Sequence, residues 1–249
     1  LGVLNNTHSR AFQQALSYSN VLMLTKEVDP GADPAGRPIA MGEFFVKTAA
    51  RLALQRERDL IVKAFGDLQY GALHQQGVET IVHTARDRIR RHPGEVMLTV
   101  DVKNAFNSVS RESVFAAVAH YGLVNLYGIV WALYERPSQL LSPVITDLWS
   151  TQGVRQGDPL GPILFALAIQ PALQRLRAAH PHVFLKAYLD DITIIGPPEE
   201  AAAVYAALVT EMRGVTLEVN PQKCIVSALS LLPLSALTSL GVRHSVGGQ

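Results

Sequence analysis

Two adjacent carboxylates, Asp190 and Asp191, lie between two strongly apolar, strand-like stretches. Burying two Asp anions among apolar side chains costs free energy unless something compensates the charge. We therefore expect the pair at the tip of a hairpin, where a divalent cation can neutralise both. Asp101 follows another apolar stretch and would end a strand. Three carboxylates on adjacent strands would supply the oxygen ligands that Mg²⁺ prefers, as in sites where two ions assist in-line phosphoryl displacement.

The elements that would position these carboxylates follow from hydrophobic periodicity and turn residues. We expect helices over 42–64, 78–91, 111–120, 125–134 and 199–213. A long apolar helix is also expected to end near Ala179, with Asp158 or Gly161 as its N-terminal cap. We expect strands over 95–102, 144–149, 183–188, 192–195, 215–219 and 224–227. Ser110 is expected to cap the third of these helices. The sequence therefore predicts an α+β protein in which all three carboxylates lie at strand ends.

The composition sets limits on the class of protein. A chain of 249 residues with 48% hydrophobic content is expected to fold around one large core or two smaller lobes. The net charge of +1 does not by itself indicate nucleic-acid binding. The single cysteine, Cys224, excludes an internal disulfide framework. The longest apolar runs are shorter than the roughly 20 residues of a membrane span, so no membrane partner is expected. The sequence does not begin with Met, which indicates a fragment of a longer protein.

Two basic segments leave alternatives open. The turn-rich loop 28–38 has Lys26 and Arg37 at its ends, so it could hold a polyphosphate, although a solvated surface loop is the better interpretation of the loop alone. Four arginines close the helix over 78–91, namely Arg86, Arg88, Arg90 and Arg91. They could contact a phosphate backbone or simply favour the helix macrodipole.

Three segments, in this order, resemble the central palm motifs of reverse transcriptases, particularly those of retrotransposons. They are Asp101-Val102-Lys103-Asn104-Ala105-Phe106, Gln156-Gly157-Asp158-Pro159-Leu160-Gly161-Pro162 and Tyr188-Leu189-Asp190-Asp191. Weaker matches to the same family are Arg37-Pro38-Ile39-Ala40, Gln69-Tyr70-Gly71 with Gly77-Val78, and the stretch 217–224. Together these segments cover roughly residues 20–227.

The resemblance implies a right-hand polymerase architecture. In this α+β fold, a helical, fingers-like subdomain is expected over 1–95. A palm subdomain, with an antiparallel sheet backed by helices, is expected over 96–249. No segment after Lys223 resembles a thumb, so a downstream thumb or other domains of a longer polyprotein are expected partners.

The resemblance also implies roles for individual residues. Asp101, Asp190 and Asp191 would be catalytic and would bind two Mg²⁺ ions, or Mn²⁺, together with the backbone carbonyl of Val102. The residues implied to bind the incoming dNTP are Lys26, Arg37, Phe106, Gln156, Gly157 and Lys223, with Lys223 placed to protonate the leaving pyrophosphate. The implied contacts to an RNA template and a DNA or RNA primer are Tyr188, Gln69 and Gly71.

Phe106 bears on the choice of sugar. In the family, an aromatic residue at this position packs under the sugar and leaves no space for a 2′-hydroxyl, whereas polymerases that make RNA typically have a second Asp there. Phe106 therefore favours DNA synthesis, although a core aromatic residue remains the plain alternative. Gly161 stands where many relatives have Ser, and Leu189 where Ala is frequent, so the subfamily stays open.

The predicted function is that of an RNA-directed DNA polymerase of a retroelement, which adds dNTPs to a primer 3′-hydroxyl. Two alternatives remain open at this point. One is a catalytically impaired or domesticated fragment that binds nucleic acid without turnover. The other is a palm polymerase that synthesises RNA. An extension assay, and a comparison of dNTP with rNTP, would distinguish them.

Overall fold

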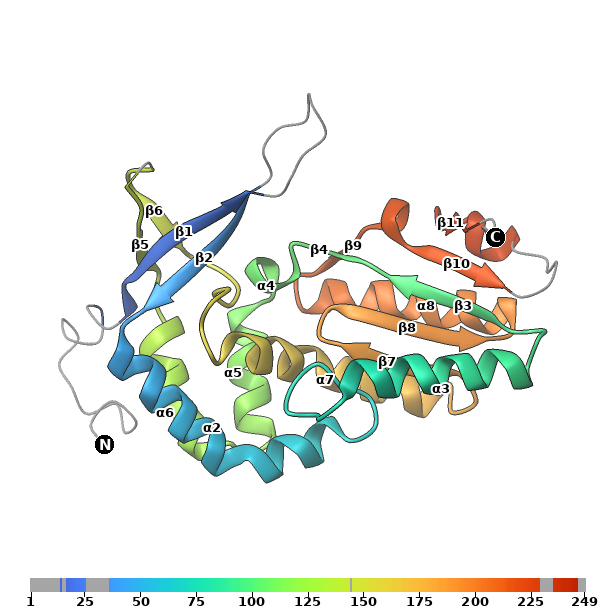
Figure 1. The fold of residues 1–249 in the computed structure, drawn as a ribbon, viewed down its shortest axis with the longest axis horizontal. Helices are drawn as coiled ribbons and strands as arrows, with labels where there is room; N and C mark the ends of the chain where they lie inside the picture. Colours follow the sequence, from blue (N-terminus) through green and yellow to red (C-terminus); the bar gives the residue numbers. More distant parts are fainter. Residues whose placement is uncertain (1–13, 15–16, 26–35, 144, 229–234, 246–249) are drawn as a thin grey trace. The chain divides into compact units, whose positions relative to one another are not determined.

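The chain forms two compact units, and each is described by itself (Figure 1). The structure is a computed structural model that describes residues 14, 17–25, 36–143, 145–228 and 235–245, with the backbone alone at 23–25 and 36–38. The first unit comprises Leu1–Ile61 and Phe106–Phe165, and the second comprises Val62–Ala105 and Ala166–Gln249. The chain thus passes between the units three times, and the expected subdomain boundary at residue 95 stays a prediction.

A five-stranded sheet forms the centre of the second unit, in the order β11-β10-β3-β8-β7. Its strands are β3 (Val96–Val100), β7 (Phe184–Tyr188), β8 (Asp191–Gly196), β10 (Ile225–Ala228) and β11 (Arg243–His244). All neighbouring pairs are antiparallel except β10 and β11. In β3, Val96, Leu98 and Val100 are buried and alternate with more exposed residues, as expected for a strand packed mainly on one face.

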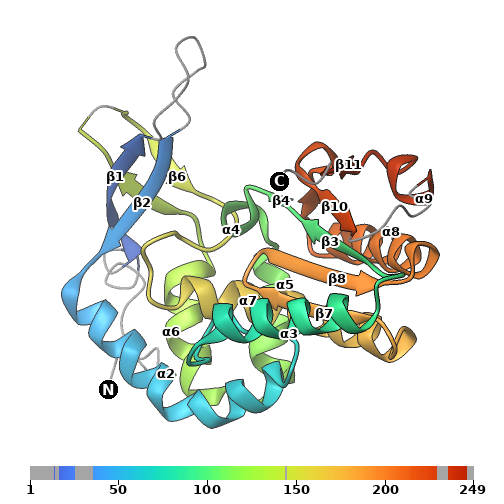
Figure 2. The same ribbon diagram turned by 45° about the vertical axis from the view of Figure 1, so that its right-hand side comes forward.

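Helices pack against this sheet (Figure 2). Helix α8 (Pro198–Gly214) contacts β3 and β8, and helix α3 (Gly77–Arg91) contacts β7 and β8. The smaller elements of the unit are β4 (Val102–Lys103), β9 (Glu218–Val219), the 3-10 helix η1 (Pro221–Lys223) and α9 (Ser235–Thr238). The expected antiparallel palm sheet backed by helices is therefore confirmed.

The first unit combines helices with a four-stranded sheet in the order β2-β1-β5-β6. Its strands are β1 (Ser19–Thr25), β2 (Gly36–Gly42), β5 (Ser138–Leu141) and β6 (Leu148–Ser150). Its helices include α4 (Ala105–Ser108), α5 (Arg111–His120) and α6 (Val124–Tyr134), and both α2 (Phe44–Phe65) and α7 (Gly161–Ala179) continue into the second unit. Ser110 caps α5 as predicted, because its Oγ accepts a hydrogen bond from the Ser113 backbone N–H at 3.2 Å.

The sequence did not predict β2, because Gly36 and Pro38 are turn residues in most contexts. Its place in the sheet explains the difference. Among the described strands, β2 lies at the edge of its sheet and pairs with β1 alone, with Pro38 opposite Met23. Proline is tolerated in an edge strand, where its missing N–H need not join a ladder.

Among the described residues, no helix combines the length and apolarity needed to cross a bilayer.

Candidate active site

The β7–β8 hairpin carries the two adjacent carboxylates at its tip. Tyr188 pairs with Asp191, which leaves Leu189 and Asp190 as a two-residue turn. Leu189 adopts a φ of 57°, a left-handed conformation that costs a residue with a Cβ atom about 1–2 kcal/mol. The predicted hairpin is therefore present, and a strained residue, Leu189, directly precedes the catalytic candidates.

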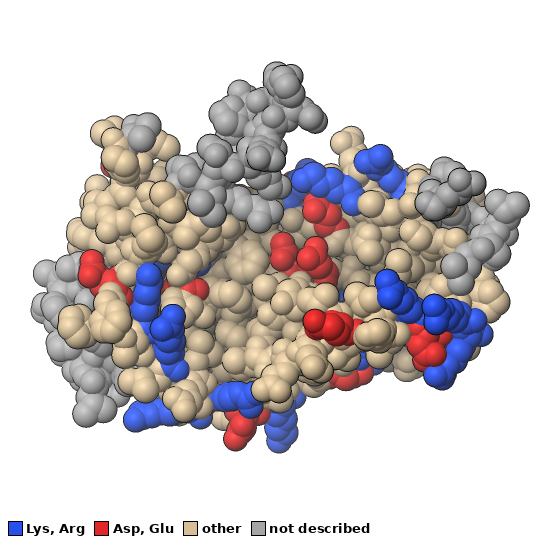
Figure 3. Space-filling model, in the orientation of Figure 1, with Lys and Arg blue, Asp and Glu red and all other residues tan. Residues whose placement is uncertain are grey.

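Asp101 lies across the sheet from Asp191. The last residue pair between β3 and β8 is Val100 with Ile192, so the next positions in this antiparallel register are Asp101 and Asp191. Partial burial, and then the negative charge of Asp101, raise the pKa of the Asp191 carboxyl. Figure 3 shows acidic side chains gathered in the region where β3 ends and the hairpin turns. The carboxylates of Asp101 and Asp191, from distant parts of the chain, are thus close enough to repel one another.

This pair fits the chemistry of a hard divalent cation. Its donors are carboxylate oxygens, and a cation would offset both the partial burial and the repulsion from Asp101 that raise the Asp191 pKa. Within the described parts of the chain, however, no group of three or more His, Cys, Asp or Glu side chains lies close enough to hold a metal. A convergence of Asp190 with the other two carboxylates, and a ligand role for the Val102 carbonyl, stay predictions.

Asp191→Asn is expected to raise the Tm of the metal-free protein at neutral pH and to leave it unchanged in acid. A carboxyl with a raised pKa in the folded state favours folding while it is protonated, and this stability is lost as the pH rises through that pKa. The amide of the Asp191→Asn variant cannot ionise, so this stability is not lost as the pH rises. The measurement is Tm in excess EDTA between about pH 3 and pH 8.

Asp67→Asn provides a control of opposite sign. Partial burial raises the pKa of Asp67, but the hydrogen bond and charge of Lys186 and the charge of Arg177 outweigh it and lower the pKa overall. Its stabilising effect is therefore present at neutral pH and is lost as the pH falls. Asp67→Asn should lower the Tm at neutral pH only, and equal pH profiles for the two variants would contradict both assignments.

The segment after β9 holds the backbone of Asp101. The backbone N–H of Asn220 donates to the Asp101 carbonyl at 2.9 Å, and the Asp101 N–H donates to Cys224 Sγ at 3.5 Å. Burial raises the pKa of the Cys224 thiol, so it stays protonated at neutral pH and donates to the Asn220 carbonyl at 3.2 Å. Lys223 is exposed in the same segment. The sequence indicated no such role for Cys224, because the hydrogen bonds of a single cysteine cannot be predicted from its neighbours in the sequence.

Three further candidates lie along the hairpin. Tyr188 is half-buried at the end of β7. Gln69 is 1% exposed, and its amide bonds to the backbone of Leu189. Gly71 approaches so closely that an added Cβ would lie 2.4 Å from the Leu189 nitrogen. Their contacts to template or primer stay predictions.

Five of the candidates that the resemblance implies for dNTP binding belong to the first unit. Phe106, in α4, stacks on the buried Phe165 with ring centroids 4.9 Å apart. The carbonyl of Gln156 accepts a hydrogen bond from the Ala40 N–H at 2.7 Å. Gly157 has a φ of 98°, and an added Cβ would lie 2.6 Å from the Ala40 carbonyl oxygen, so only glycine fits there. Arg37 lies in β2, but its side chain, like the whole of Lys26, is outside the described part of the structure.

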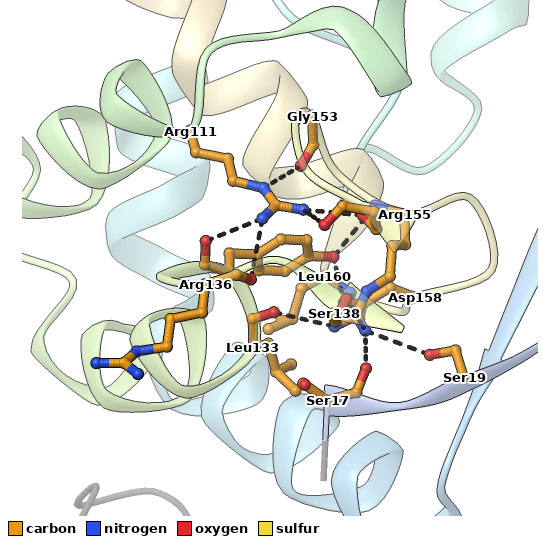
Figure 4. Close-up of polar contacts among 12 residues, drawn as sticks. Ser17, Ser19, Arg111, Leu133, Arg136, Ser138, Gly153, Arg155, Asp158 and Leu160 are labelled. Carbon is orange, nitrogen blue, oxygen red and sulfur yellow. Dashed lines mark hydrogen bonds and ion pairs between the residues drawn. The ribbon is translucent and has the colours of Figure 1, made fainter. Parts of the chain in front are cut away.

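A buried arginine anchors the loop that carries Gln156 and Gly157 (Figure 4). Arg155 is 6% exposed, and its guanidinium donates to the carbonyls of Ser17 and Leu133 and to the hydroxyls of Ser19 and Ser138. These contacts tie the loop to β1, α6 and β5. The sequence analysis assigned no role to Arg155, because its partners lie in distant parts of the chain.

Tyr134 connects this arginine to Asp158. The guanidinium groups of Arg155 and Arg111 both lie over the Tyr134 ring, at 4.9 and 5.4 Å from its centroid. Burial and the Asp158 charge raise the Tyr134 pKa, so the phenol stays neutral and donates to Asp158 Oδ2 at 2.5 Å. Asp158 Oδ1 accepts from the Leu160 N–H at 2.9 Å. Burial lowers the pKa of Arg111 to about 10, which leaves it charged at neutral pH.

Arg155→Met is expected to destabilise the protein by about 3 kcal/mol, on the order of 10 °C in Tm. The substitution keeps much of the volume but removes the donor from the buried carbonyls of Ser17 and Leu133. Arg136→Met is the control, because its guanidinium pairs with Glu135 at the surface and its side chain is 60% exposed. Thermal unfolding of both variants tests this, and equal Tm values would refute an anchoring role.

The four arginines of α3 do not form a uniform basic cluster in the structure, because acidic side chains pair with some of them. Arg88 makes a bidentate contact to Glu95, with its shorter distance 2.5 Å, and Arg91 pairs with Asp87 one turn away at 2.6 Å. At least two of the four side chains therefore take part in ion pairs within the unit.

A family model and solved structures show which proteins this chain resembles. The family model described as reverse transcriptase (RNA-dependent DNA polymerase) matches residues 32–243. The chain therefore belongs to the reverse transcriptase family, and the resemblance seen in its motifs is confirmed. Solved telomerases share the fold. A telomerase from Candida albicans in complex with a TWJ fragment of telomeric RNA superimposes with a TM-score of 0.64 and 12% sequence identity, covering 91% of this chain and 44% of that chain. An apo telomerase from Candida tropicalis, truncated from its C-terminal domain, has a TM-score of 0.62 and 12% identity, covering 87% of this chain and 51% of that chain.

Curated relatives are retrotransposon proteins. The chain is 31% identical over 202 residues to the retrotransposable element SLACS 132 kDa protein of Trypanosoma brucei gambiense, covering 78% of this chain and 16% of that protein. It is 26% identical over 233 residues to the Pol polyprotein of the type-1 retrotransposable element R2 of Nasonia vitripennis, covering 86% of this chain and 22% of that protein. The chain thus spans less than a quarter of either relative.

Proposed function

We propose that this chain carries the polymerase centre of a retrotransposon reverse transcriptase, which copies an RNA template by adding dNTPs to a DNA or RNA primer. The observation that carries the proposal is the placement of Asp101 opposite Asp191 at matched strand ends, beside the Asp190 turn. The chain's membership of the family supports it.

In the proposed mechanism, Asp101, Asp190 and Asp191 hold two Mg²⁺ ions. When bound, such ions activate the attacking 3′-hydroxyl and neutralise charge on the phosphates. Gly157 permits close approach of a nucleotide, Phe106 limits the space beside its 2′ carbon, and Lys223 donates a proton to the leaving pyrophosphate. Positioning and charge neutralisation supply most of the rate enhancement, as is general for phosphoryl transfer.

Primer extension tests the proposal. The purified chain, an RNA template with an annealed DNA primer, the four dNTPs and Mg²⁺ should yield products extended to the template end, and EDTA should abolish them. Binding of the primer–template without extension, in Mg²⁺ and in Mn²⁺, would instead support a nucleic-acid-binding fragment. Preferential use of rNTPs would indicate an RNA-synthesising polymerase.

A further inference from the structure

The segment 68–71 is joined to the catalytic hairpin by a single parallel β-bridge. The Tyr70 N–H donates to the Ala187 carbonyl at 2.7 Å, and the Ala187 N–H donates to the Leu68 carbonyl at 2.7 Å. Gln69 and Ala187 form the corresponding parallel bridge. The segment therefore follows β7 toward the turn that carries Asp190.

The side chain of Gln69 is bonded to that turn. Its Oε1 accepts from the Leu189 N–H at 2.7 Å and from the Gly71 N–H at 3.1 Å, and its Nε2 donates to the Leu189 carbonyl at 3.4 Å. The residue is 1% exposed. The carboxamide thus bonds to both backbone polar groups of Leu189, and both its oxygen and its nitrogen are hydrogen-bonded.

These bonds act on the strained residue of the hairpin. The φ of 57° at Leu189 is unfavourable for leucine, and strain of this kind persists where the surroundings impose it. Gly71 lets the segment approach the turn closely, because any side chain there would collide with Leu189 and Tyr188. The orientation of the next two residues, Asp190 and Asp191, depends on the conformation that these contacts fix.

We propose that Gln69 is a positioning residue for the metal-binding carboxylates. By bonding both backbone groups of Leu189, it holds the turn in the conformation that presents Asp190 and Asp191 to divalent cations. This inference rests on the proposed function, since it assigns Gln69 a part in preparing the same metal site. It also replaces a direct contact with template or primer as the main task of this side chain.

The test compares three variants with the parent protein. Gln69→Met keeps the volume and removes every hydrogen bond. Gln69→Glu is the conservative variant, because it keeps an acceptor for the Leu189 N–H. Gln75→Leu is the matched control, since Gln75 is an exposed glutamine of the same loop.

Three measurements are made on each protein: Mn²⁺ affinity by electron paramagnetic resonance, hydrogen exchange of the Leu189 amide, and affinity for a fluorescent primer–template in EDTA. For Gln69→Met we expect about tenfold weaker Mn²⁺ binding and at least about tenfold faster exchange, in line with the loss of one to two hydrogen bonds. Primer–template affinity should stay within about twofold of the parent value. Gln69→Glu should be intermediate, and Gln75→Leu should match the parent.

Adding Leu189→Gly sharpens the test, because glycine adopts a positive φ without strain. If both residues act through one turn, the loss of Mn²⁺ affinity in the double variant is smaller than the product of the two single losses. Unchanged Mn²⁺ affinity and amide exchange in Gln69→Met, with weaker primer–template binding, would overturn the inference in favour of a template contact. Failure of the proposed function would differ, since Asp101→Asn would then leave Mn²⁺ binding unaltered.

Discussion

Asp101→Asn and Asp190→Asn are each expected to reduce primer extension by at least ~10³-fold, equivalent to ~4 kcal/mol of lost transition-state stabilisation. Each substitution removes an anionic ligand from a site that needs full carboxylate charge to hold divalent cations. The fold should persist, because Asp101 makes its hydrogen bonds to Asn220 and Cys224 through its backbone, which the substitution retains.

Single-turnover extension and thermal unfolding separate these two effects. Asp87→Asn is the control, since Asp87 is an exposed acid of the same unit, paired with Arg91. It should extend primers at the parent rate. Extension by Asp101→Asn at near-parent rate would remove Asp101 from the mechanism, whereas a Tm well below that of Asp87→Asn would make it a structural residue.

Phe106→Ala is expected to lower the preference for dNTP over rNTP by about 10- to 100-fold, a range typical of steric discrimination in a pocket. The ring stacks on Phe165, which is fully buried, so its position is fixed by packing. Removing the ring opens the space that a 2′-hydroxyl would need. Because both substrates are compared on one preparation, the ratio of their kcat/KM values does not depend on how much of the variant is folded.

Phe115→Ala is the matched control for this experiment. Phe115 is an aromatic residue of the same unit that packs against Trp131 on α5 and α6. Its removal should change stability but leave sugar selection as in the parent. A dNTP to rNTP ratio that is equal in Phe106→Ala and the parent would show that Phe106 is a packing residue only.

The geometry of the hairpin was predictable because it depends on local rules. Strongly apolar, strand-like stretches on either side of Asp190 and Asp191 predict two strands with the acidic pair at the hairpin tip. The turn itself differs by one residue, because it consists of Leu189 and Asp190, and Asp191 begins β8. The pairing of β3 with β8 could be expected from the resemblance, but the register that places Asp101 across from Asp191 comes from the structure.

The contacts that position the site could not be predicted, because they join residues far apart in the chain. Gln69 and Leu189 are separated by 120 positions, and Arg155 and Ser17 by 138. The hydrogen-bond partners of a Gln or an Arg are determined by tertiary packing, so the residue type alone does not predict them. Edge strand β2 was missed for a related reason, since only its place in the sheet makes Pro38 acceptable.

Metal binding by the carboxylates decides whether this chain is the polymerase centre that we propose. The measurement is the anomalous scattering of Mn²⁺ in crystals of the chain with primer–template and a non-hydrolysable dNTP. We expect two Mn²⁺ peaks about 3.5–4 Å apart, with Asp101 and Asp191 each contacting at least one of them. Mn²⁺ peaks remote from Asp101, or density at the dNTP with no metal ion beside these carboxylates, would contradict the proposed mechanism.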